Sequence, residues 1–164
     1  MRRAITVLPA GTWREAEPVA TATLPFDQRQ RRRIRMLDDA GEPFLLDLDR
    51  PVTLADGDGL GLAGGGIIRV RAADEAVIEA RGATAAEAAR LAWHLGNRHA
   101  PVQVLADGTL RLRDDPVLAA MLHGLGARIL SRHAPFAPEP GAYVGAGSAR
   151  EDHHQHGLDH ADDR

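Results

Sequence analysis

Histidine is the residue type in this sequence whose placement could support chemistry. His99 follows Gly96-Asn97-Arg98 and stands directly before Ala100-Pro101. Four more histidines lie near the C-terminus, at His153, His154, His156 and His160. Neutral imidazole is a common ligand of nickel, copper and zinc. Because one imidazole cannot fill a coordination sphere, a metal site at His99 needs further ligands from the tail or from a second copy of the chain.

The C-terminal histidines are interspersed with acidic residues, which favour a cation: Glu151, Asp152, Asp159, Asp162 and Asp163. The alternative interpretation is a polar tail with no metal role. A mobile tail collects metal with little selectivity, because its geometry is not preset. The pattern therefore predicts tail histidines that supplement a better-defined site.

The other three histidines favour structural interpretations. His94 lies in the last turn of an expected helix, where an imidazole commonly interacts with the helix C-terminus. His123 is expected in a terminal turn and His133 in a loop, and neither has a partner in the sequence. We therefore do not predict these histidines as ligands.

Composition excludes several classes of protein. The chain has no cysteine, so disulfides, thiolate zinc sites and cysteine nucleophiles are excluded. The net charge of −3 provides no global field for nucleic acid or an anionic membrane. No run approaches the roughly 20 apolar residues of a membrane span, and the N-terminus is too polar for a signal peptide, which favours the cytoplasm. No nucleophile–base pair or paired carboxylates accompany His99, so we do not expect an enzyme.

Two further patterns have simpler explanations. Residues 59–64 match G-x-G-x-x-G, but strand-like Ile67-Ile68 follows where a dinucleotide site needs a helix. We therefore predict a glycine-rich turn. An arginine cluster around residues 29–35 alternates with Ile34 and Met36, and no aromatic residue is interleaved for base stacking. A solvated strand face is the favoured interpretation, and a surface for a protein partner is the alternative.

Residues 1–73 are predicted to form a small all-β domain, because short strand-like runs alternate with turn residues and no long helical period occurs. The expected strands are Ile5–Leu8, Ala20–Leu24, Arg31–Leu37, Phe44–Leu48, Val52–Leu54 and Ile67–Val70.

Residues 74–134 are predicted to form a βαββαβ, ferredoxin-like domain. Thr84 and Glu87 form a capping box that begins a helix over Ala85–Leu95, and Gly96 occupies the position of a left-handed C-cap. Asp107-Gly108 predicts a hairpin, and Asp115-Pro116 predicts the start of the second helix. The overall class is therefore α+β. Residues 135–164 are rich in Pro, Gly and charge, and are predicted to be a disordered, histidine-containing tail.

These residues resemble the urease accessory nickel chaperones, the E proteins of the urease accessory system. The resemblance covers nearly the whole chain. It rests on five segments: Thr23-Leu24-Pro25, Ala72–Glu75, His94–Gln103, Asp115–Leu122 and Pro135–Tyr143.

The resemblance implies a β-rich, peptide-binding-like first domain and a ferredoxin-like metal domain that forms a homodimer. It also implies that His99 from both subunits binds one Ni(II), with tail histidines adding ligands, and that Zn(II) or Cu(II) can occupy the same site. The expected partners are the urease accessory GTPase and, through it, the apo-urease assembly complex. Residues 113–116 contain no histidine where some relatives have a peripheral metal site, so that site is not expected.

Two alternatives stay open. The chain could be a general buffer for zinc, copper and nickel without a client, in which case the tail matters more than His99. It could also be a peptide-binding module, using exposed edges of the first domain, whose metal binding is incidental.

Overall fold

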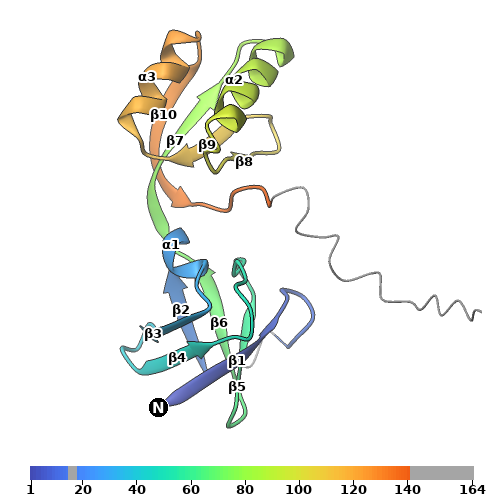
Figure 1. Ribbon diagram of the computed structural model, residues 1–164, viewed down its shortest axis with the longest axis vertical. Coiled ribbons are helices and arrows are strands. Elements are labelled where there is room, and N and C mark those ends of the chain that lie inside the picture. Colours follow the sequence, from blue (N-terminus) through green and yellow to red (C-terminus); the bar gives the residue numbers. More distant parts are fainter. Residues whose placement is uncertain (15–17, 141–164) are drawn as a thin grey trace, which may run out of the picture.

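The computed structural model describes residues 1–14 and 18–140. Figure 1 shows two parts stacked along the long axis, one built on each of two sheets. The change from the first sheet to the second occurs at Ala73, between two successive strands. No helix in the described ranges is both long and apolar enough to cross a membrane.

The first sheet has six strands in the order β2-β6-β5-β1-β4-β3. Backbone and Asp39 side-chain hydrogen bonds also tie the β3–β4 turn to β2, so the sheet curls around its core. A short helix, α1 (Phe26–Arg29), is the one departure from an all-β first part among the described residues. The strands are β1 (Arg2–Leu8), β2 (Ala20–Leu24), β3 (Arg33–Leu37), β4 (Pro43–Asp47), β5 (Gly59–Leu62) and β6 (Ile67–Ala72).

Two local predictions for this sheet need correction. Val52–Leu54 is not a strand, although Leu54 is fully buried in the core. The glycine-rich segment predicted as a turn instead begins with strand β5, and the turn follows it. A Cβ at Gly61 would lie 2.4 Å from the Thr6 hydroxyl, so glycine lets β5 approach β1 closely.

The arginine-rich strand follows the predicted alternation. Met36 is buried and Ile34 is half-buried, whereas Arg33 and Arg35 are exposed. A strand, β6, follows the glycine-rich segment where a dinucleotide site needs a helix, in agreement with the sequence interpretation.

The second part has the predicted βαββαβ order, with the strands arranged β10-β7-β9-β8. Both β7 and β8 are antiparallel to β9, which lies between them, so this is a split βαβ arrangement. Both helices cover one face of the sheet (Figure 1). The elements are β7 (Asp74–Arg81), α2 (Ala85–Asn97), β8 (Gln103–Val104), β9 (Leu110–Arg113), α3 (Pro116–Gly124) and β10 (Arg128–Pro135).

The predicted tail begins later than expected. Strand β10 continues to Pro135, and Phe136 is fully buried against Phe26 and Val77. The free energy gained by burying this one aromatic ring offsets the entropy lost in ordering the chain around it. The Pro-, Gly- and charge-rich composition of the segment gave no sign of this burial. Residues 135–140 are therefore part of the folded structure, and the rest of the predicted tail, residues 141–164, lies outside the described residues.

A buried arginine joins the two parts of the molecule. Arg29 is 1% exposed and donates hydrogen bonds to the carbonyls of Leu24, Leu54 and Phe136. Burial lowers the pKa of its guanidinium, and the nearby charges of Glu75 and Asp56 oppose that shift. Because guanidinium stays protonated over the whole physiological range, Arg29 links α1, the loop at Leu54 and the end of β10 as a cation.

Replacing Arg29 with Met is expected to lower the free energy of unfolding by about 3 kcal/mol, because buried carbonyls lose their donors. Chemical denaturation of the full chain measures this change. The matched control is Arg35→Met, at an exposed strand position, which should change stability by less than about 0.5 kcal/mol. Equal effects of the two substitutions would show that Arg29 does not hold the parts together.

Candidate metal centre

Helix α2 supports the best-placed histidine. The Thr84 hydroxyl accepts a hydrogen bond from the Glu87 amide, and the Glu87 carboxylate accepts one from the amide of Ala83. The predicted capping box therefore forms, with Glu87 reaching one residue beyond the cap. Leu91 and Leu95 lie on the buried face of the helix, packed in the core of the second part. This packing fixes the C-terminal end of α2 against the sheet.

The end of α2 differs from the sequence prediction. Gly96 was expected to be the left-handed cap, but it lies inside the helix, which continues to Asn97. His99 is instead the left-handed residue, with a φ of 53°. Its amide donates to Gly96 O at 2.9 Å, and the amide of Ala100 donates to Leu95 O at 3.2 Å. This pair of hydrogen bonds is a Schellman motif with histidine where glycine is usual.

The left-handed backbone at His99 is strained, and it exposes the imidazole. A side chain in this region costs about 1 kcal/mol relative to glycine, because its Cβ crowds the backbone. Such strain at a single residue often marks a functional constraint. His99 is exposed, whereas Leu95 and Ala100 on either side of the turn pack in the core. The motif therefore presents one imidazole to solvent on a rigid turn.

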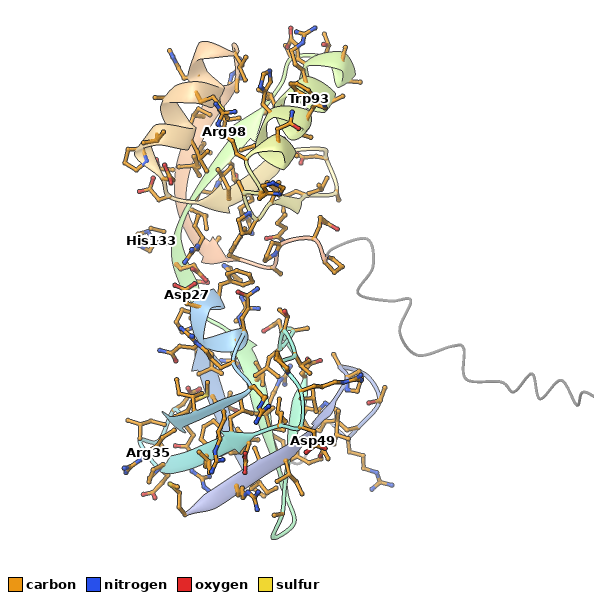
Figure 2. The ribbon with its side chains drawn as sticks, in the orientation of Figure 1. Asp27, Arg35, Asp49, Trp93, Arg98 and His133 are labelled. Atoms are coloured by element: carbon orange, nitrogen blue, oxygen red, sulfur yellow. The ribbon has the colours of Figure 1, made fainter. Side chains whose placement is uncertain are left out.

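The second histidine of this segment is placed differently. His94 is half-buried, and its ring lies 4.9 Å from that of Trp93 in an edge-to-face arrangement. Trp93 projects from α2 and is 64% exposed (Figure 2). Within residues 1–14 and 18–140, no three His, Asp or Glu side chains gather closely enough to hold a metal ion. Any site at His99 therefore needs ligands that the described part of one chain does not supply.

A hollow of about 810 Å³ opens beside the His99 turn. Arg98, Ala100 and Pro101 line one side of it, and Asp115 and Val117 at the start of α3 line another. The Asp115 carboxylate caps α3, as predicted, because it accepts hydrogen bonds from the amides of Val117 and Leu118. Sequence reasoning missed this hollow, since the proximity of the α2–β8 turn to α3 is a long-range feature.

The last described residues run close to the same turn. The Glu139 amide donates to the carbonyl of Val102, which follows His99 by three residues, at 2.8 Å. The Glu139 carboxylate in turn accepts from the amide of Val104 at 3.1 Å. The predicted tail ligands His153, His154, His156 and His160 lie outside the described residues. The two contacts nevertheless fix the start of the tail next to the His99 segment.

Both parts of the chain match a known family. Residues 3–73 match the family model "UreE urease accessory protein, N-terminal domain", and residues 75–162 match "UreE urease accessory protein, C-terminal domain".

Several curated proteins described as urease accessory protein UreE are similar to this chain. The Beijerinckia indica protein is 48% identical, over 95% of this chain and 87% of its own length. The Rhodopseudomonas palustris strain BisB18 protein is 47% identical, over 93% of this chain and 72% of its own. The Rhodobacter capsulatus protein is 44% identical, over 98% of this chain and 96% of its own length.

Replacing His99 with Gly is expected to raise the free energy of unfolding by about 1 kcal/mol, because glycine adopts a positive φ without the Cβ penalty. Denaturant unfolding of the metal-free chain provides the measurement. His123→Gly is the matched control, since His123 lies inside the last turn of α3 and glycine there should be destabilising. A loss of stability in His99→Gly would contradict the strain assigned to this position.

Proposed function

The chain belongs to the UreE urease accessory protein family, and on that premise we propose that it is a nickel chaperone that binds Ni(II) through His99 and delivers it for urease assembly. As a member of this family it is an accessory protein and not an enzyme, in agreement with the sequence prediction. The proposed route of delivery runs through the urease accessory GTPase to apo-urease, in the cytoplasm.

The observation that carries the proposal is the left-handed backbone at His99. The turn keeps a costly conformation at a residue whose side chain is exposed. An exposed imidazole on a rigid turn can bind a borderline divalent metal with little reorganisation. Because His99 has too few neighbouring ligands in one chain, we propose that two chains share one metal ion.

Exposed apolar side chains on the second part support the proposed homodimer. Large apolar side chains are exposed on three elements of the second part: Trp93 on α2, Val104 on β8 and Val117 on α3. Exposed apolar side chains of this size favour burial at an interface. In a twofold dimer the same residue meets its own copy near the axis, so an interface close to His99 would bring two imidazoles together.

The tail histidines complete the proposed coordination sphere. Glu139 lies beside the His99 turn, and the chain that follows it carries His153, His154, His156 and His160. Tethering raises the effective concentration of these ligands without any new rigid contact. Ligands on a tail can also leave first, which provides a path for exchange of the metal to a partner protein.

Imidazole alone does not select nickel. Affinity for nitrogen ligands rises from nickel to copper along the divalent series, so Cu(II) and Zn(II) can compete for the same ligands. In our proposal selectivity arises from geometry and from the delivery partner. A general metal buffer would show no such partner dependence.

In calorimetric titration with Ni(II), His99→Ala is expected to weaken the tightest binding event by about 100-fold, or ~2.7 kcal/mol, because both imidazoles of the shared site are lost. The wild-type event should have a stoichiometry of one metal per two chains. His123→Ala is the control and should bind like the wild type. Unchanged tight binding in His99→Ala would refute the proposed site and favour a buffer function of the tail.

Replacing His153, His154, His156 and His160 together with Ala should preserve the stoichiometry of the tight event and weaken it by about tenfold, since only supplementary ligands are removed. Transfer of nickel is then tested by adding the urease accessory GTPase with nucleotide to the nickel-loaded chain. If the tail variant loses the tight event entirely, the tail and not His99 is the main binder.

A further inference from the structure

The second sheet has an open face that is rich in arginine. Ile78, Ala80, Leu110 and Leu112 point towards α2 and α3, so the alternate strand residues point away from the helices. The register places Arg111 and Leu130 opposite Glu79, and Arg132 opposite Val77, on this other face. We call this surface the basic face. Its arginines are Arg81, Arg111, Arg113, Arg128 and Arg132.

Carboxylates neutralise only part of this charge. Glu79 contacts Arg111 at 2.7 Å and Arg132 at 2.9 Å. Asp107 pairs with Arg81, and Asp27 of the first part pairs with Arg113. Arg128 makes no ion pair within the part of the chain that the structure describes. Among the same described residues, Glu75, at the junction end of this face, pairs with none of its arginines and instead accepts a hydrogen bond from the Phe26 amide. The basic face therefore keeps a positive surplus around Arg128 and Arg132.

An exposed apolar side chain lies within this surplus. Leu130 is between Arg128 and Arg132 on the same face of β10 and is 49% exposed. The strands β7, β8, β9 and β10 contain no Phe, Tyr or Trp, so the basic face offers no ring for stacking nucleic acid bases. An acidic segment with an apolar side chain is the better match.

The chain contains such a segment. Residues 141–164 hold five carboxylate side chains and only two arginines, Arg150 and Arg164, which accounts for the whole net charge of −3. Residues 1–140 are therefore electrically balanced, with 18 basic and 18 acidic side chains. Leu158 lies within the acidic stretch.

The chain enters this segment from the basic face itself. Arg111 donates to the carbonyl of Pro135 at 3.0 Å, and the Ala137 amide donates to the side chain of Gln103, which lies opposite Arg111, at 3.1 Å. The last described residues thus cross the junction end of this face. Residues 141–150 can span at most about 33 Å, whereas a strand as long as β7 spans about 26 Å, so the acidic residues can reach Arg128.

We propose that the acidic C-terminal segment, residues 151–163, docks on the basic face of its own chain. Its carboxylates pair with Arg128 and its neighbours, and Leu158 covers Leu130. The docking needs no metal and does not rest on the proposed function. The same segment carries the four tail histidines, so if they bind metal as proposed above, the basic face competes with the metal site for the tail.

A spin label provides the test, because the chain has no cysteine and a Gln155→Cys substitution creates a unique attachment site. The full chain is studied by NMR without metal at low salt. The label is expected to reduce the amide signals of residues 128–132 to less than about half of those in the reduced sample. The signals should recover at about 1 M NaCl, where the Debye length falls to about 3 Å.

Charge reversal supplies the specific control. Arg128→Glu should abolish the signal loss, whereas Arg35→Glu should leave it unchanged, because Arg35 lies in the first sheet at the other end of the molecule (Figure 2). Signal loss that is absent, spread evenly over both sheets, or unaffected by Arg128→Glu would overturn the proposal. In that case the basic face would be free for a separate acidic protein.

Discussion

The pair of backbone hydrogen bonds that ends helix α2 is the constraint on which the rest of the candidate site depends. The bond from Ala100 to Leu95 turns the chain back onto the core, and the bond from His99 to Gly96 requires a left-handed residue at that turn. Leu95 is thereby buried and Ala100 is half-buried against the core, whereas His99 in the turn between them is exposed. Glycine at this position would make the fold more stable but would present no imidazole to solvent.

A second constraint determines where the tail begins. Arg29 is a buried cation that donates hydrogen bonds to three backbone carbonyls, including that of Phe136 after the last strand. Its pKa is lowered by burial but starts so high that the charge persists. A lysine there would lose the forked donor geometry, and its charge would be easier to remove. By fixing Phe136, Arg29 directs the following residues across the second sheet, so the end of the fold leads to both the His99 turn and the basic face.

The features predictable from the sequence were those with local causes. Thr84 and Asp115 cap their helices through atoms a few residues away, so their signals are readable in the sequence. The burial of Arg29 and Phe136 depends on contacts about a hundred residues apart along the chain, and no local pattern encodes them. The prediction of Gly96 as the left-handed cap was wrong. The helix continues past Gly96, and the left-handed residue is His99, three residues later. Histidine is not a usual residue at such a position, so only the folded backbone identifies it.

We propose that His99 from two chains shares one nickel ion. A crystal of the nickel-loaded full chain, measured on both sides of the nickel absorption edge, tests it most directly. A shared site should give one anomalous peak on a twofold axis, within bonding distance of an imidazole nitrogen of both His99 residues. A peak bound by histidines of the tail alone, or one remote from His99, would contradict it.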